Sequence, residues 1–268
     1  MSQKFRNILK GEEAYFYLIL IFHFTILLLG MDMQILLKLS LFQELISILP
    51  IRMVQLLCLL LSAMNGHVDA IRALTALGAD VNTPAKNGVT PVYIAAHNGH
   101  VDAIKALVAL GADVNTPAND GATPVSMAAH NGHVDVIRAL IAFGADVNTP
   151  DKSGATPVLV AAHNGNVNLI RALCALGADV NTPDNDGVTP VAMAAHNGHV
   201  DVIRALVALG ADVNAPNKNG TAPVLDAARN GHVDVIKILV ALGADVNTPD
   251  ENGATPLSIA AHNGHVDA

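Results

Sequence analysis

One five-residue string recurs through most of the chain at a fixed interval of 33 residues. Gly-Ala-Asp-Val-Asn starts at positions 78, 111, 144, 177, 210 and 243. An Asn-Gly pair keeps the same interval and starts at positions 65, 98, 131, 164, 197, 230 and 263. A fixed period of this length is typical of solenoids, in which one unit cannot bury its own apolar face and stacked units bury it together. The repeat therefore constrains the fold more than any other feature of the sequence.

Each unit contains the signals for two short helices and one loop. The unit that starts at residue 118 reads ANDGATPVSMAAHNGHVDVIRALIAFGADVNTP. Thr123 is a predicted N-cap, and Pro124 takes the first helical position, where a missing N–H costs nothing. Two adjacent alanines in this helix let a neighbouring helix approach closely, and the Asn-Gly pair ends it. Apolar residues at helical spacing, with Asp135 in the first turn, predict a second helix from about 134 to 143. Gly144 ends this second helix, and a hairpin-like turn then leads to the next Thr-Pro.

The recurring pattern G-x-T-P-V…A-A-x-x-G-H…G-A-D-V-N resembles the ankyrin repeat over about residues 53–268. The resemblance implies an all-α ankyrin-repeat solenoid of helix-turn-helix units with hairpin loops, preceded here by an apolar N-terminal helical segment. It also implies a non-enzymatic scaffold that binds a protein partner on its concave face. We divide the repeats into a degenerate first unit at 53–84, full units at 85–117, 118–150, 151–183, 184–216 and 217–249, and a partial unit at 250–268.

Several positions depart from the family pattern. The histidine that the family places after T-P-L is replaced by other residues, which leaves open what ties the turns of adjacent units together. Ala222 replaces the N-cap threonine of one unit, at an expected cost of about 1 kcal/mol. Asn166 and Asn168 replace the histidine and aspartate of another unit. The residues in place of the family histidine are Tyr93, Ser126, Leu159, Ala192, Leu225 and Ser258.

The chain stops at Ala268, inside the predicted second helix of its last unit. Repeat arrays usually end in a unit with a polar outer face. We therefore expect the chain to be a fragment whose remaining repeats follow this position. In one alternative, the chain is part of a multidomain enzyme whose catalytic domain lies beyond the C-terminus.

Residues 1–52 differ in composition from the repeats. Residues 14–30 form a run of 17 without a charge, which is the lower edge for a membrane span. No small-x-small site follows, so a cleaved signal peptide fits poorly. Three interpretations stay open: a membrane anchor, apolar helices that cap the array, or a translated gene start not selected for folding. With an anchor, the chain would be a membrane-tethered scaffold or the sensor part of a larger membrane protein.

Composition narrows the function classes. The net charge is −8 and no basic block occurs, which disfavours nucleic-acid binding. Cys58 and Cys174 show no ligand or redox spacing, which suits a reducing compartment. No nucleophile–base pair and no Gly-rich phosphate loop stands out. We therefore expect a cytoplasmic, monomeric array with no catalytic residue, cofactor or metal, and with membrane association only through residues 14–30.

The string HNGHVD at 130–135 places two histidines three residues apart in unit after unit. The first would end one helix and the second would begin the next, so they do not share a face. Corresponding residues of adjacent units lie about 8–10 Å apart, whereas zinc needs nitrogens at about 2.0–2.1 Å. We expect the second column to be structural (His67, His100, His133, His199, His232 and His265). We expect the first to be exposed toward a partner (His97, His130, His163, His196 and His262, with Arg229).

By resemblance, partners contact the hairpin tips and the first helices. The candidates at the tips are Lys86, Asn87, Asn119, Asp120, Lys152, Ser153, Asn185, Asp186, Lys218 and Asn219. Those on the helices are Tyr93, His97, Met127, His130, Val160, His163, Met193, His196, Asp226 and Arg229. A negative array with a histidine column leads us to expect pH-sensitive binding of a neutral or basic protein.

Overall fold

The computed structural model describes residues 66–76, 78–265 and 267. The chain divides into two units, Met1–Val54 and Gln55–Ala268, and the description below concerns the second. The segment 1–52, its three interpretations, and most of the degenerate first repeat lie outside the described residues.

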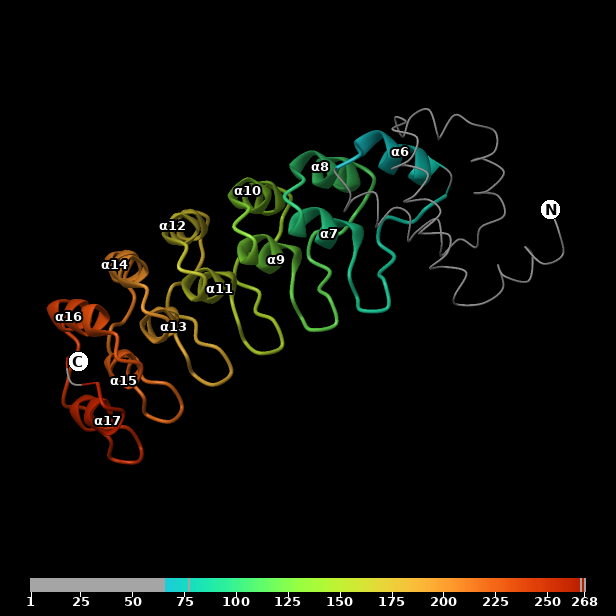
Figure 1. The fold of residues 1–268 in the computed structure, drawn as a ribbon. Coiled ribbons are helices and arrows are strands. Elements are labelled where there is room, and N and C mark those ends of the chain that lie inside the picture. The colour runs from blue at the N-terminus through green and yellow to red at the C-terminus, as the bar shows by residue number, and fades with distance from the viewer. Residues whose placement is uncertain (1–65, 77, 266, 268) are drawn as a thin grey trace, which may run out of the picture. The chain divides into compact units, whose positions relative to one another are not determined.

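The described helices alternate between seven and nine residues. The seven-residue helices are α7 (Pro91–His97), α9 (Pro124–His130), α11 (Pro157–His163), α13 (Pro190–His196), α15 (Pro223–Arg229) and α17 (Pro256–His262). The nine-residue helices are α6 (Val68–Ala76), α8 (Val101–Ala109), α10 (Val134–Ala142), α12 (Val167–Ala175), α14 (Val200–Ala208) and α16 (Val233–Ala241). Figure 1 shows the odd-numbered and even-numbered helices as two parallel rows, with the loops extending past the odd row. The predicted all-α ankyrin solenoid is confirmed.

The short helices begin where the Thr-Pro pairs predict. Thr90 Oγ1 accepts a hydrogen bond from the Tyr93 N–H at 3.2 Å, and Thr156 Oγ1 accepts one from Leu159 at 3.3 Å. Each bond satisfies one of the N–H groups that a helix leaves unpaired at its start. The predicted second helix of the unit at 118 ends one residue earlier than expected, at Ala142.

Ala222 starts α15 without any side-chain hydrogen bond to the helix, as the substitution predicted. We expect Ala222→Thr to raise the free energy of unfolding by about 1 kcal/mol, because a threonine Oγ1 would add a side-chain acceptor for the Leu225 N–H, which now bonds only the Ala222 carbonyl at 3.0 Å. Urea denaturation followed by circular dichroism measures the change. Thr156→Ala is the matched control and should lower stability by a similar amount. An unchanged midpoint for Ala222→Thr would contradict this account of capping.

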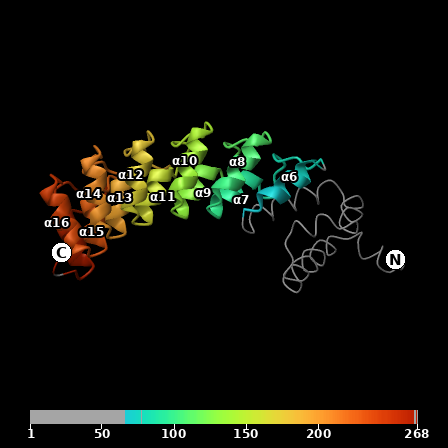
Figure 2. The same cartoon turned by 90° about the horizontal axis from the view of Figure 1, so that it is seen from above.

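Alanine pairs bring the odd-numbered helices close together. Ala161 and Ala162 of α11 are fully buried, whereas the even-numbered α10 fills the interior with Ile137 and Leu140. Adjacent odd helices accordingly contact each other more extensively than adjacent even helices. The repeat array therefore bends, with the odd row on its concave side, as the view from above shows (Figure 2).

The asparagine of Gly-Ala-Asp-Val-Asn joins each unit to the next. Asn148 Nδ2 donates to the Gly177 carbonyl at 3.2 Å, and its Oδ1 accepts from the Asp179 N–H at 2.9 Å. Asp179 in turn accepts hydrogen bonds from Asn181 N–H and Thr182 Oγ1, and these lower the pKa of its carboxyl. The same two bonds between units recur at Asn82, Asn115, Asn181 and Asn214.

The described helices are less than half the length of about 20 residues that a bilayer span requires. Accordingly, no helix in the described part of the chain could cross a membrane. The uncharged run at 14–30 lies outside that part.

Candidate interaction surface

The second histidine of HNGHVD connects two units. His133 Nε2 lies 3.1 Å from the His97 carbonyl, and His199 Nε2 lies 3.0 Å from the His163 carbonyl. The His133 ring also lies so close to Gly99 that a Cβ there would sit 3.0 Å from it. The same contact joins His232 to His196 and His265 to Arg229. The structural role expected for the second column is confirmed at these positions.

One unit replaces this contact with a different one. Asn166 stands in place of the second histidine, and its Oδ1 instead caps α12 by accepting from the Leu169 N–H at 3.0 Å. The His130 carbonyl of the preceding unit then accepts from Asn164 Nδ2 at 3.1 Å. The substitution therefore changes which side chain joins the units and leaves them joined.

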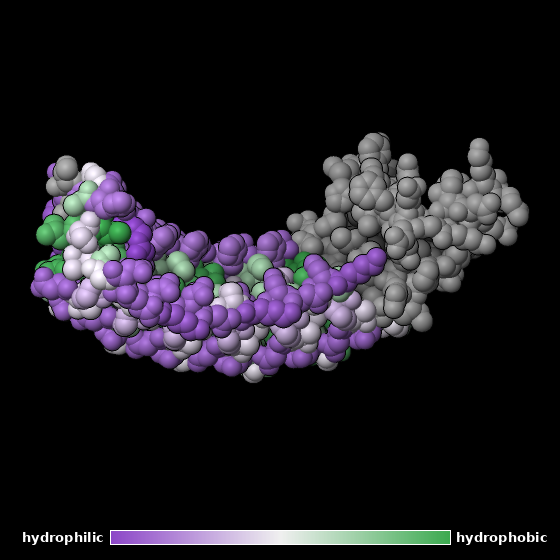
Figure 3. Space-filling model, turned by 90° about the horizontal axis from the view of Figure 1, so that it is seen from below, coloured by the Kyte–Doolittle hydropathy of each residue, from purple (hydrophilic) through white to green (hydrophobic). Residues whose placement is uncertain are grey.

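The first column ends the odd-numbered helices, and we call it the concave row. Its histidines are exposed, as predicted, and Arg229 is partly exposed. The members of the concave row are His97, His130, His163, His196, Arg229 and His262. The view from below shows the array hollowed on one side, with hydrophobic residues between hydrophilic bands (Figure 3).

An asparagine of the next unit fixes the tautomer of three histidines in the concave row. Asn131 Nδ2 lies 3.2 Å from His97 Nδ1 and also donates to the Met127 carbonyl at 3.0 Å, so the amide nitrogen faces the ring. His97 Nδ1 must then accept, which leaves its proton on Nε2. His163 and His196 are held in the same way by Asn197 and Asn230. Each of the three therefore keeps an Nε2–H donor that bonds no other group among the described residues.

The hairpin tips form a continuous hydrogen-bonded strip along the array. Lys152 N–H donates to the Asp120 carbonyl and Lys218 N–H to the Asp186 carbonyl, both at 3.0 Å. Asn185 N–H likewise donates to Ser153 at 2.9 Å. These bonds, together with those of Asn148 and its counterparts in the other units, tie the turns together without the family histidine. The strip also presents lysine and aspartate side chains in alternating units.

Asp226 is the one carboxylate on the odd-numbered helices of the described chain, and it is only 7% exposed. Its Oδ1 accepts a hydrogen bond from Arg229 Nη1 at 2.7 Å. Burial raises the pKa of Asp226, while the charges of Arg229 and His196 act in the opposite direction. A buried carboxylate costs free energy unless a cation pairs with it, and Arg229 is that cation.

The structure places the twenty candidate residues in three groups. Most are exposed, and Met127, Val160, Met193 and Arg229 are half-buried. Tyr93 and Asp226 are buried and offer a partner little surface. Burial and the nearby Asp120 charge both raise the pKa of the Tyr93 hydroxyl.

Sequence reasoning did not include the asparagines beside the concave row. It assigned Asn131 only to a turn, although its side chain reaches His97 of the preceding unit. Met127 also lies against that ring, with its Sδ 3.1 Å from His97 Nδ1. A separation of 34 residues, one more than the period, is the only signal that could have suggested the Asn–His contact.

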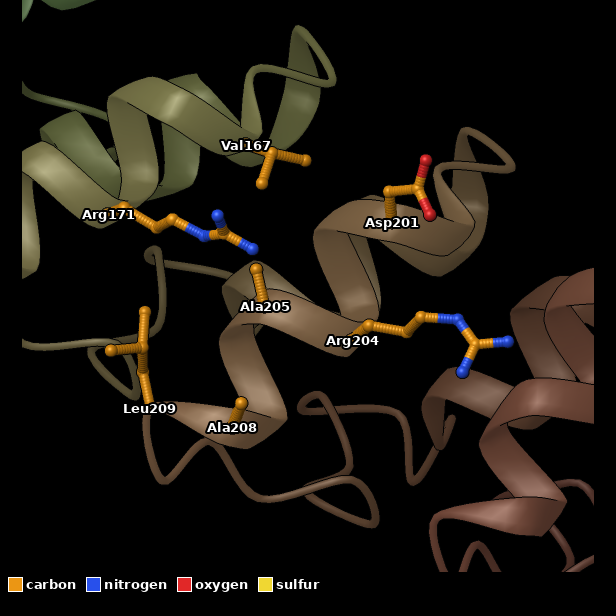
Figure 4. Close-up of a pocket in the computed structure, with 7 residues that line it drawn as sticks. All are labelled: Val167, Arg171, Asp201, Arg204, Ala205, Ala208 and Leu209. Carbon is orange, nitrogen blue, oxygen red and sulfur yellow. The ribbon is translucent and has the colours of Figure 1, made fainter.

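A shallow groove of about 540 Å³ lies on the other row, between α12 and α14 (Figure 4). Arg171 reaches into it from α12, whereas Arg204 points away from Arg171. Because Asn168 replaces the aspartate of other units, Arg171 lacks the i−3 carboxylate that pairs with Lys105 in α8. The two guanidinium groups do not converge, so the groove does not form an anion clamp.

Within residues 66–76, 78–265 and 267, no three His, Cys, Asp or Glu side chains are placed to hold a metal ion. Burial raises the pKa of the Cys174 thiol, which disfavours the reactive thiolate.

Comparisons with known proteins agree with this geometry. The sequence profile described as ankyrin repeats (3 copies) matches residues 40–118, 59–151, 128–217, 176–250 and 210–268. The chain is similar to the crystal structure of the human ASB11 ankyrin repeat domain, with 30% identity and a TM-score of 0.67. That similarity covers 76% of this chain and 90% of the other. A comparison with curated proteins returned no match.

Proposed function

The chain belongs to the ankyrin-repeat family, and from this premise we propose that it is a non-enzymatic scaffold that binds a protein partner on its concave face. Ankyrin repeats are in general protein–protein interaction modules. The binding surface comprises the concave row and the strip of hairpin tips, because both follow the array from unit to unit.

The observation that carries the proposal is the contrast between the two histidine columns. The second column makes hydrogen bonds between units through Nε2, as at His133 and His199. The first column is exposed at the ends of the concave helices, and the Nε2 of His97, His163 and His196 makes no hydrogen bond within the described residues. A repeated donor that packing does not use is available to a partner.

We expect the triple variant His97→Ala/His130→Ala/His163→Ala to bind the natural partner about tenfold more weakly or worse, which corresponds to about 1.4 kcal/mol. The partner is first recovered on the full-length chain and its affinity is then measured by calorimetry. The control is Arg138→Ala/Arg171→Ala/Arg204→Ala, whose side chains are exposed on the even-numbered row. A partner sensitive to the control and insensitive to the histidine variant would place binding on the convex side and contradict the proposal.

We also propose a second candidate, a membrane-tethered scaffold, because of the 17-residue uncharged run at 14–30. Full-length chain should then sediment with membranes, and a chain that starts at Met53 should stay soluble. If both remain soluble, the tether is wrong and the concave-face proposal is unaffected.

A further inference from the structure

The concave row differs in charge from the rest of the chain. The chain has a net charge of −8, and Asp120 and Asp186 lie at the hairpin tips, but the odd-numbered helices carry almost no carboxylate. Asp102 and Asp201 lie on even-numbered helices, and Asp179 is engaged in its own turn. On the described odd-numbered helices the only carboxylate is Asp226, which is buried against Arg229. The concave row itself therefore presents hydrogen-bond donors, one of them a guanidinium, and no exposed carboxylate.

Arg229 is the fixed member of this row. Its side chain is 38% exposed, whereas that of its partner Asp226 is 10% exposed. The 2.7 Å bond uses Nη1, and a guanidinium carries five N–H donors in a rigid plane. The remaining N–H donors of Arg229 bond no group within residues 66–76, 78–265 and 267. The buried Asp226 thus fixes the position of the guanidinium, and the exposed edge of the guanidinium stays open to a partner.

His196 supplies a second donor in the preceding unit. Asn230 Nδ2 lies 3.2 Å from His196 Nδ1 and also donates to the Asp226 carbonyl at 3.0 Å, which leaves the imidazole proton on Nε2. His196 ends α13 and Arg229 ends the adjacent α15, so the two side chains occupy the same position in neighbouring units. One imidazole N–H and one guanidinium therefore follow each other along the concave row.

We propose that Arg229 is the anchor of the concave face and binds a carboxylate of an extended acidic segment in the partner protein, with His196 donating beside it. This inference rests on the proposed function. The planar fork of arginine matches a carboxylate with two parallel hydrogen bonds, and these are among the stronger hydrogen bonds in proteins. No other member of the concave row is an arginine, and none is paired with a buried acid.

The spacing of the row sets the spacing of acceptors in the partner. Packed helices lie about 8–10 Å apart, and a segment in the extended polyproline II conformation advances about 3.1 Å per residue with three residues per turn, so every third side chain points the same way. About three residues of an extended segment therefore span one unit. Acidic or carbonyl-bearing side chains at every third position would face His196, Arg229 and His262 in turn.

The test is a selection from a library of random 12-residue peptides displayed on phage, with the full-length chain as bait. Peptides selected on the natural chain should be enriched in Asp and Glu, with a three-residue spacing. A selected peptide, made by synthesis, should bind Asp226→Met/Arg229→His at least about tenfold more weakly than the natural chain. This variant gives α15 the Met and His that α13 carries at the corresponding positions, and it removes the guanidinium. Arg229→Lys keeps the charge without the fork and should bind with intermediate affinity.

Controls distinguish the Arg229 anchor from binding to the concave face in general. Replacing the anchoring Asp or Glu of the peptide by its amide should weaken binding to the natural chain and leave binding to Asp226→Met/Arg229→His unchanged. Enrichment of Lys and Arg, no enrichment at all, or acidic peptides that ignore the Arg229 substitutions would overturn the anchor. If the affinity of the selected peptides still falls when His97, His130 and His163 are replaced, binding to the concave face stands without the Arg229 anchor. If they depend on neither set, both proposals fail.

Discussion

Gly154→Ala is expected to lower the free energy of unfolding by about 2–5 kcal/mol, a large effect for the addition of one methyl group. Gly154 lies at a hairpin tip with φ of +85°, a conformation that side chains with a Cβ adopt at a cost of about 1–2 kcal/mol. A Cβ there would also lie 2.5 Å from the Asn185 backbone nitrogen and 2.9 Å from the Asp184 carbonyl carbon. These are backbone atoms of the next unit, so they cannot rotate out of the way.

Relief of that overlap must separate two adjacent tips. The bond from Asn185 N–H to the Ser153 carbonyl, at 2.9 Å, would lengthen, and so would the bond from Asn185 Nδ2 to Lys152 at 2.8 Å. Each hydrogen bond contributes about 0.5–1.5 kcal/mol, which adds to the backbone strain. Because a solenoid is held together by contacts between adjacent units, the array should unfold in two parts on either side of residue 154.

Gly144→Ala is the matched control. Gly144 has φ of +90°, but a Cβ there would meet nothing within 4 Å. It should therefore lose only the strain of about 1–2 kcal/mol and keep a single cooperative transition. Urea denaturation of both full-length variants, followed by circular dichroism, measures the difference. Equal losses would show that φ strain alone determines the effect and that tip packing does not contribute.

The sequence predicted the helices well because their signals are local. Thr123 and Pro124 mark a helix start by chemistry within three residues, and α9 begins at Pro124 as expected. The contacts between units were not predictable in the same way. That Asn148 bonds Gly177 and Asp179 depends on how one unit stacks on the next, which periodicity alone does not specify.

The candidate site was predicted in part for the same reason. Exposure of His97 follows from its place at the end of a short concave helix. Its tautomer depends on Asn131 of the following unit, and no pattern within one unit contains that contact. Asp226 and Arg229 stand where α13 has Met193 and His196, but only the fold shows that Asp226 is buried and paired with Arg229. Departures from a repeat therefore indicate where to look, and packing determines what they do.

The ion pair between Asp226 and Arg229 leads to the second large expected effect on stability. Arg229→Ala should lower the free energy of unfolding at pH 7 by about 1–3 kcal/mol. Loss of one partner of a fully buried pair costs about 3–5 kcal/mol, and the 38% exposure of Arg229 reduces this through solvent screening. Asp226→Met/Arg229→His should be as stable as the natural chain or more so, because apolar packing replaces a buried charge.

The pH dependence identifies the cause of that loss. Burial already raises the pKa of Asp226 above its ordinary value, and removal of Arg229 takes away the main charge that lowers it. A carboxyl with a raised pKa in the folded chain contributes stability below its unfolded pKa of about 3.9 and loses it as pH rises. The deficit of Arg229→Ala should therefore be largest at neutral pH and shrink toward pH 4. Urea midpoints for Arg229→Ala and the natural chain at several pH values test this, and a deficit that stayed constant would assign the loss to packing of the arginine stem instead of to the carboxylate beneath it.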